Sequence, residues 1–313
     1  RQSTSANSKA WIVLIMRDTA FITTKLLQIM VALSIVKQLN LHDRAHFLVV
    51  DNFFRARSVF ERLTLADWEF SRLDITFCPS YKDAHEFVSR NRIKNLFIDS
   101  DVGFRNFIAL FRLKLKNIKL IINVYEEGVG TYRSDLYVGI KKILFNLIGI
   151  GCQFGGSVLA NALYLYDPEE HRRKFPKFRK KICKINLSHA DFIRENLNNI
   201  RYIFDYNYVC GGASRICYVY LSGWQINDDF IKLFLDLEGD KFIKPHPAIK
   251  SNVLDTVKSS VRVIPNHVPA ELLILDLERK YEKIIVLHEG SSVERYLSKE
   301  NLEFVCCGGI LKS

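Results

Sequence analysis

The sequence predicts an α/β protein with two parallel β-sheets. In the first half, short apolar runs rich in β-branched and aromatic residues alternate with stretches of helical apolar spacing. A second alternating series starts near residue 216 and continues to the end of the chain. Continuous apolar strands separated by helices are typical of parallel sheets that are covered on both faces. The length of 313 residues fits two domains of roughly 150 residues each.

The first half contains the strand and helix patterns of one such sheet. Each predicted strand is an apolar run that ends at polar or turn-forming residues, and these runs lie at 11–16, 45–51, 74–79, 95–101 and 119–128. The helical patterns between them lie at 24–39, 53–64, 81–92 and 104–115.

The second half repeats this organisation. The predicted strands lie at 216–223, 241–247, 261–265, 283–290 and 302–309, and the predicted helices at 227–237, 250–258, 269–280 and 292–299. We divide the chain into an N-terminal domain of residues 1–208 and a C-terminal domain of residues 209–313. Two Rossmann-like domains bind ligands at the carboxyl ends of their strands, so we expect a cleft between them. This arrangement is that of the GT-B glycosyltransferases.

An uncharged segment separates the two series. Residues 143–166 contain no charged side chain and are long enough for a bilayer span, but they include four glycines, which interrupt a helix. We expect a buried or membrane-touching helix–loop–helix here. The following run, residues 171–184, has Lys or Arg at eight of its fourteen positions.

The charge balance points to an anionic partner. The chain carries a formal net charge of +11, with nucleic acid, phosphorylated substrates and an acidic membrane as candidates. Its seven cysteines form no CxxC pair, which favours reduced thiols in the cytosol and disfavours zinc. Residues 1–9 are polar and lack the apolar core of a signal peptide.

Two polar clusters follow predicted strands and carry groups suited to catalysis. Glu126 and Glu127 come directly after an apolar strand, and since adjacent residues of an extended chain point to opposite sides, only one of the two can face a cleft. That carboxylate could act as a general base. In the second cluster, prolines on both sides of His246 restrict its backbone, and Lys244 adds positive charge, which suits a phosphate leaving group.

Two further clusters suit a nucleotide. At Gly290-Ser291-Ser292 a strand runs into a helix, so hydroxyls and free backbone N–H groups would meet as an anion site. Ser291 could alternatively cap the helix, with Glu294 completing a capping box. Glu271 lies in the first turn of a predicted helix, where the helix dipole favours it, and could accept hydrogen bonds from ribose hydroxyls.

The ordered set of motifs resembles the bacterial sialyltransferases. That family has an acidic–acidic–Gly motif, a His-Pro motif and a Ser-Ser or Ser-Thr motif, which here read Glu126-Glu127-Gly128, His246-Pro247 and Ser291-Ser292. The sequence segments YEEGVGTY and KPHP are also similar to those of enzymes that sialylate lipopolysaccharide, O-antigen and capsule.

The resemblance implies an inverting, metal-independent transfer from CMP-sialic acid with no further cofactor. It implies that Glu126 or Glu127 is the base, with Glu126 favoured, and that His246 assists departure of the CMP phosphate. The remaining donor-nucleotide site would comprise Lys244, Pro247, Glu271, Gly290, Ser291 and Ser292. The acceptor would be a hydroxyl, such as that of galactose, on a lipid-linked O-antigen, lipooligosaccharide or capsule glycan. The enzyme would then be cytoplasmic and peripheral at the inner face of the inner membrane, on an anionic lipid surface.

Three other functions remain open on sequence grounds. A CMP-Kdo transferase of capsule or lipopolysaccharide assembly would also use a His-Pro motif and the same nucleotide. A non-catalytic, membrane-associated protein would share the basic run and the apolar segment but need none of the four clusters. A nucleic-acid-binding protein would suit the charge, but no binding-module signature is present, and we expect no nucleic-acid partner.

Overall fold

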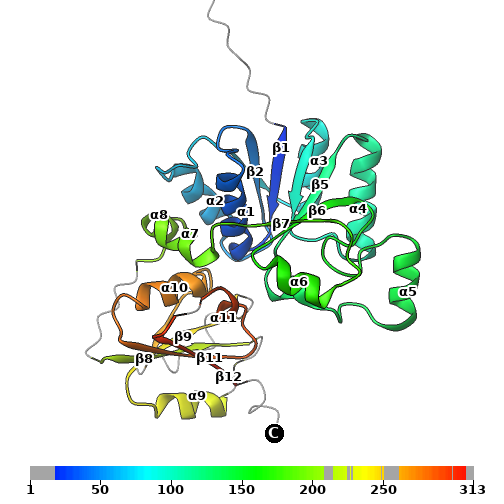
Figure 1. Ribbon diagram of the computed structural model, residues 1–313. Helices are drawn as coiled ribbons and strands as arrows, with labels where there is room; N and C mark the ends of the chain where they lie inside the picture. The colour runs from blue at the N-terminus through cyan, green and yellow to red at the C-terminus, as the bar shows by residue number, and fades with distance from the viewer. Residues whose placement is uncertain are drawn as a thin grey trace, which may run out of the picture.

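The computed structural model describes residues 18–207, 214–223, 226, 228–247, 249, 261–297 and 299–307. They form two parallel β-sheets with helices around them (Figure 1). The predicted strand at 11–16, the predicted helix at 250–258 and the predicted boundary between residues 208 and 209 lie outside these ranges.

The first sheet has seven strands in the order β3-β2-β1-β4-β5-β6-β7, and every pairing is parallel. The strands are β1 (Thr19–Thr23), β2 (Ala45–Val50), β3 (Asp74–Cys78), β4 (Asn95–Ile98), β5 (Ile121–Tyr125), β6 (Ala160–Leu165) and β7 (Lys181–Lys184). The helices are α1 (Leu26–Gln38), α2 (Ala56–Leu65), α3 (Tyr81–Arg90), α4 (Gly103–Lys116), α5 (Gly139–Leu147), α6 (Pro168–Lys174), α7 (His189–Glu195) and α8 (Leu197–Ile203), with a 3₁₀ turn η1 (Val129–Tyr132).

Both faces of this sheet are buried, as the continuous apolar strands predict. Successive side chains of a strand point to opposite faces. Phe21 and Phe47 accordingly pack with α1 and α2 in one cluster, whereas Ile22 and Leu48 pack with α3 and α4 in another. The sheet lies between these two helix layers (Figure 1).

Two sequence predictions differ from the structure of the first half. The first described strand is β1, which the sequence analysis did not predict, because its five residues begin and end with threonine and follow the more apolar run at 11–16. The uncharged segment 143–166 is not a helix–loop–helix: only its start belongs to a helix, α5, and its end is the strand β6. A short uncharged apolar run fits a helix or a buried strand equally well, and pairing with β5 and β7 selects the strand here.

The second sheet has five strands in the order β10-β9-β8-β11-β12, again all parallel. They are β8 (Ile216–Leu221), β9 (Asp240–Lys244), β10 (Arg262–Val263), β11 (Lys283–His288) and β12 (Leu302–Cys306). The helices are α9 (Asp228–Leu235), α10 (Ala270–Leu277) and α11 (Val293–Tyr296).

One hydrophobic cluster joins the two halves, because it contains residues of α1, α7 and α8 together with residues of α10 and β11. Polar contacts support this junction. The buried carboxylate of Asp276 on α10 pairs with Arg201 and accepts a 3.1 Å hydrogen bond from the Tyr206 hydroxyl. Arg194 lies 3.3 Å from Glu278. The two sheets are therefore held together by packed helices as well as by the chain that connects them.

Within the described parts of the chain, no helix combines the length and the apolar character that crossing a bilayer requires.

Candidate active site

The carboxyl ends of β5 and β11 lie against each other. Gly128 follows β5, and a Cβ atom built on it would lie 3.9 Å from the Ser292 Oγ atom, which follows β11. The φ of Gly128 is +121°, a conformation that side-chain-bearing residues rarely adopt, so glycine is required by the backbone here. The acidic motif and the Ser-Ser motif are thus neighbours across the two sheets.

Glu126 is fully buried between the two halves of the molecule. Its carboxylate accepts hydrogen bonds from the Tyr132 hydroxyl (2.6 Å), the Tyr296 hydroxyl (2.7 Å) and the Tyr166 N–H (2.8 Å). The Arg295 guanidinium lies 3.7 Å away. Burial raises the pKa of Glu126, and these donors together with Arg295 oppose the rise. Its oxygens are occupied by protein groups, so it ties β5 to α11.

Glu127 has the opposite orientation, as the alternation of an extended chain predicts. Its side chain is 19 % exposed and pairs with the Lys25 ammonium group, which follows β1. The Glu127 N–H donates a 2.9 Å hydrogen bond to the Thr131 hydroxyl and so fixes the backbone at this position. The accessible carboxylate of the acidic motif is that of Glu127, although sequence reasoning favoured Glu126 as the base.

His246 lies in a loop after β9 that buried groups hold in place. Its N–H donates a 3.0 Å hydrogen bond to the Ser222 Oγ atom after β8. Beneath the loop, the buried Lys244 ammonium group donates to the carbonyl oxygens of Pro245 (2.6 Å) and Asn266 (3.2 Å). Burial lowers the pKa of Lys244 to about 8, and burial with the nearby Lys244 charge lowers the pKa of His246. His246 is half-buried and Pro247 is exposed.

The Gly290-Ser291-Ser292 loop differs in part from the predicted anion site. The N–H groups of Gly290 and Ser291 are not free, because both donate to His288 Nδ1, at 3.2 and 3.1 Å. The Ser291 hydroxyl accepts a 3.3 Å hydrogen bond from the Val293 N–H, but the N-cap of α11 is Ser292, whose side chain forms no capping hydrogen bond. Glu294 does not complete a capping box: its carboxylate lies 3.3 Å from His288 Nε2.

The Ser292 hydroxyl has no hydrogen-bond partner among the residues that the structure describes. It is the group of this loop that faces Gly128. The predicted anion site at this loop therefore depends on the two hydroxyls more than on the backbone N–H groups.

Glu271 is buried in the first turn of α10, where the sequence predicted it. Burial raises the pKa of Glu271, and the Lys244 charge opposes this rise. Next to it, the His267 ring after β10 lies 3.4 Å from Arg55, which follows β2. This second contact between strand ends of the two sheets lies on the same side of the second sheet as the Ser292 contact.

Sequence reasoning missed the residues that enclose Glu126. Tyr132 stands in the segment YEEGVGTY, and Arg295 and Tyr296 follow the Ser-Ser motif after Val293 and Glu294, but none of these three positions carries a recognisable chemical pattern. Arg295 also stacks over the Tyr132 ring, with its guanidinium carbon 3.4 Å from the ring centroid, and pairs with Glu170. A cavity of about 650 Å³ opens beside this group and is lined by Tyr166, Glu170, Arg172, Lys184, Arg295 and Tyr296, among others.

Among the described residues, no group of three or more His, Cys, Asp or Glu side chains is placed to hold a metal ion.

Comparison with known proteins identifies the fold. No family model matches the chain, and no curated protein matches it by sequence. A solved structure of an α/β-galactoside α-2,3-sialyltransferase from the marine bacterium Photobacterium phosphoreum is similar, with a TM-score of 0.55 and 13% identity. That similarity covers 91% of this chain and 88% of the sialyltransferase.

Two structures of the wall teichoic acid polymerase TagF are also similar, with TM-scores of 0.51 and 0.52 at 13% identity. The similarity to these two structures covers 89% of this chain in both cases, and 66% and 67% of the polymerase chain. The chain therefore has the GT-B glycosyltransferase fold, with two Rossmann-like sheets, as the sequence predicted.

Proposed function

We propose that the protein is an inverting glycosyltransferase that transfers sialic acid from CMP-sialic acid to a hydroxyl of a bacterial surface glycan. The observation that carries this proposal is the approach of the acidic motif to the Ser-Ser motif across two Rossmann-like sheets. The similarity to a sialyltransferase over nearly the whole chain supports it as a likeness of fold. The resemblance of the three motifs to those of the bacterial sialyltransferases is the basis for proposing CMP-sialic acid as the donor.

In this reaction Glu127 is the general base. Its accessible carboxylate removes the proton of the acceptor hydroxyl as the hydroxyl oxygen forms a bond to the anomeric carbon of the donor. The bond from that carbon to the phosphate oxygen breaks, CMP leaves, and the configuration at the anomeric carbon inverts. Lys25 holds the Glu127 carboxylate through their ion pair. Glu126, enclosed by Tyr132, Tyr166 and Tyr296, positions the motif without taking the proton.

The leaving phosphate is stabilised from the second sheet. A neutral His246 can donate one N–H to a phosphate oxygen, and its lowered pKa favours the neutral form. An approaching phosphate anion favours the protonated form, so the interaction strengthens as negative charge develops on the leaving group. The hydroxyls of Ser291 and Ser292 bind the same phosphate. Buried Lys244 holds the His246 loop, and Pro247 and Gly290 shape the two loops.

Glu271 takes the ribose hydroxyls in the proposal. Because Glu271 is buried in this structure, the ribose can reach it only if the groups around Glu271 move when the donor binds. A crystal structure with CMP tests this assignment directly. Contacts from CMP to His246, Ser292 and Glu271 are expected, and CMP bound elsewhere would contradict the donor site.

The experiment that tests the function is release of the donor's nucleotide, CMP for the CMP-linked sugars, from purified protein with each candidate donor and a galactose-terminated acceptor. We expect release from CMP-sialic acid and transfer of the sugar. Release from CMP-Kdo alone would instead assign a Kdo transferase, and activity only with a UDP- or CDP-linked donor would overturn both.

The proposed acceptor is lipid-linked and met at the inner face of the inner membrane. The basic run 171–184 offers cations for contact with anionic lipid, but several of these cations have protein partners. Arg172 pairs with Glu169, Lys174 lies 2.7 Å from Glu170, and Lys180 donates to the carbonyl oxygens of Ser157 and Ala160. The run alone therefore offers fewer free charges than its composition indicates.

A further inference from the structure

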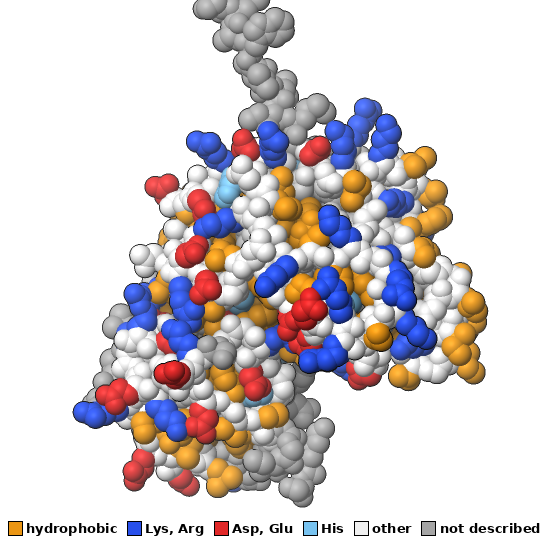
Figure 2. All heavy atoms as spheres, in the orientation of Figure 1, with side chains coloured by type: hydrophobic (Ala, Val, Ile, Leu, Met, Phe, Trp, Pro, Cys, Tyr) orange, Lys and Arg blue, Asp and Glu red, His pale blue; other side chains and the backbone are white. Residues whose placement is uncertain are grey.

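Helix α5 is apolar and yet buries none of its residues. Ile140, Ile143, Leu144 and Leu147, with Ile148 directly after the helix, are between 53% and 79% exposed. Their spacing of three and four residues places them on one face of the helix. Figure 2 shows hydrophobic side chains gathered along the edge of the molecule that α5 forms. In water such a face is unfavourable, so a contiguous apolar stripe marks a surface that binds something.

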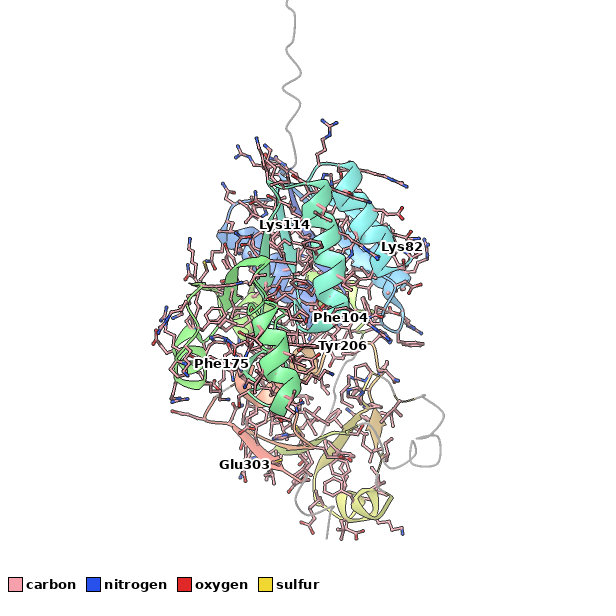
Figure 3. The ribbon with its side chains drawn as sticks, turned by 90° about the vertical axis from the view of Figure 1, so that its right-hand side faces the viewer. Lys82, Phe104, Lys114, Phe175, Tyr206 and Glu303 are labelled. Atoms are coloured by element: carbon pink, nitrogen blue, oxygen red, sulfur yellow. The ribbon has the colours of Figure 1, made fainter. Side chains whose placement is uncertain are left out.

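Helix α4 extends this surface. The backbone N–H of Gly103, at the start of α4, donates a 2.9 Å hydrogen bond to the Gly151 carbonyl oxygen, a few residues after α5. Figure 3 views this side and shows both helices toward the viewer, with Phe104 labelled at the end of α4 near α5. Phe104, Phe111, Leu115 and Ile118 are between 45% and 85% exposed. We call the exposed apolar side chains of α5 and α4 together the α4–α5 surface.

The two stretches of chain that carry this surface hold charges of one sign. No Asp or Glu occurs between Asp101 and Glu126 or between Asp135 and Asp167. These two stretches carry the cations Arg105, Arg112, Lys114, Lys116, Lys119, Lys141 and Lys142. None of these cations forms a salt bridge with a described acidic residue, although salt bridges are frequent elsewhere in the described chain. The partner must therefore combine an apolar interior with a negatively charged surface.

We propose that the α4–α5 surface docks on an anionic lipid bilayer, with the apolar face of α5 inserted at the headgroup boundary. A helix of nine residues is about 14 Å long at ~1.5 Å per residue, roughly half of the hydrocarbon thickness, so α5 lies in the plane of the membrane. A second copy of the chain is a poorer partner, because pairing the same face would bring like charges together. The proposal rests on the proposed function, which it deepens by naming the membrane face of the domain that binds the lipid-linked acceptor.

Vesicle binding by the full chain tests this without donor or acceptor. Phosphatidylcholine vesicles are prepared with and without phosphatidylglycerol, and bound protein is measured after sedimentation. We expect binding that needs the anionic lipid and weakens with salt. Ile140→Ser/Ile143→Ser/Leu147→Ser should weaken it by at least about tenfold, since each change removes an inserting side chain. The matched control is Leu65→Ser/Leu233→Ser, at residues 73% and 65% exposed on α2 and α9, which should bind as the parent does.

A site-specific probe separates insertion from loose electrostatic attachment. In Leu147→Trp, the introduced indole should be quenched by lipids brominated in their acyl chains, whereas in Leu65→Trp it should not. Equal quenching at both positions, or vesicle binding unaffected by the triple serine change, would overturn the proposal. If the parent protein is a dimer in light scattering, the triple serine variant is a monomer, and neither binds vesicles, the surface would be assigned to a second copy of the chain. Vesicle binding in a protein that releases no CMP from any donor would leave this proposal standing and overturn the proposed function.

Discussion

The Tyr296 hydroxyl on α11 donates a 2.7 Å hydrogen bond to the buried carboxylate of Glu126 at the end of β5. The two residues are 170 positions apart in the chain, and each follows a strand of a different sheet, Glu126 after β5 and Tyr296 after β11. This bond, together with Arg295, brings the helix that follows the Ser-Ser motif against the acidic motif. The loops that carry the acidic motif and the Ser-Ser motif are therefore coupled through a carboxylate that has no access to solvent.

Replacing Tyr296 by Phe should destabilise the protein by about 1.5–3 kcal/mol, because a buried, charged acceptor loses one of its donors. The measurement is the free energy of unfolding in urea. The control is Tyr202→Phe, whose exposed ring carries a hydroxyl without a hydrogen-bond partner among the described residues. A loss equal to that of the control would mean that Tyr296 contributes packing alone.

Replacing Glu127 by Gln should lower turnover by about 100-fold or more, the range expected for loss of a general base. Glu126→Gln should reduce turnover far less and should act mainly on stability, since three donors enclose that carboxylate. Turnover and unfolding are measured on the same preparations. The reverse ranking would restore Glu126 as the base, and equal mild losses at both positions would mean that neither takes the proton.

His246→Ala should lower kcat, whereas Ser291→Ala/Ser292→Ala should mainly raise KM for the donor. The histidine interacts more strongly as charge develops on the phosphate, and the hydroxyls bind it in ground and transition states alike. A useful comparison is Ser222→Ala, which removes the acceptor of the His246 N–H and should give a smaller loss of kcat. Identical kinetic effects in all three variants would contradict separate roles.

Acid should destabilise the protein between about pH 6.5 and pH 4 through buried histidines. Burial lowers the pKa of His171 to about 4, so the unfolded chain binds a proton at a higher pH than the native protein does. Stability is then fully present above the unfolded pKa and is lost as the pH falls toward the native value, by up to about 1.4 kcal/mol per pH unit for each such histidine.

His171→Phe tests this, because His171 already packs between Phe175 and Phe178, at centroid distances of 4.7 and 4.9 Å. We expect the variant to keep its stability at pH 7.5 and to lose less than the parent at pH 5, measured by urea unfolding. His189 remains in the variant, and burial lowers its pKa to about 3. The variant should therefore retain part of the pH dependence of the free energy of unfolding. If the variant loses as much unfolding free energy between pH 7.5 and pH 5 as the parent does, His171 does not contribute to the acid destabilisation.

Removal of divalent ions should leave turnover unchanged, because the proposed reaction uses Glu127, His246 and the two serines without a metal. The measurement is CMP release after treatment with EDTA. Loss of activity that a divalent ion restores would show that the metal-independent mechanism is wrong.

The sequence by itself determined the alternation of strands and helices, and with it the GT-B fold and the strand ends at which the polar motifs lie. This was possible because these signals are local: short apolar runs that alternate with helical patterns predict buried parallel strands, and the residues that follow each strand lie at the carboxyl edge of the sheet. The proximity of Gly128 and Ser292 follows from that rule once both sheets face each other.

Only the tertiary structure decided which carboxylate of the acidic pair is enclosed. Alternation along β5 requires Glu126 and Glu127 to point apart, but their direction depends on Tyr296 and Arg295 on α11, far along the chain. In the same way, the segment 143–166 divides into an exposed helix and a buried strand because β6 pairs with β5 and β7, whereas α5 buries none of its residues. Burial is a property of contacts between distant segments, and a local pattern carries no information about which contacts form.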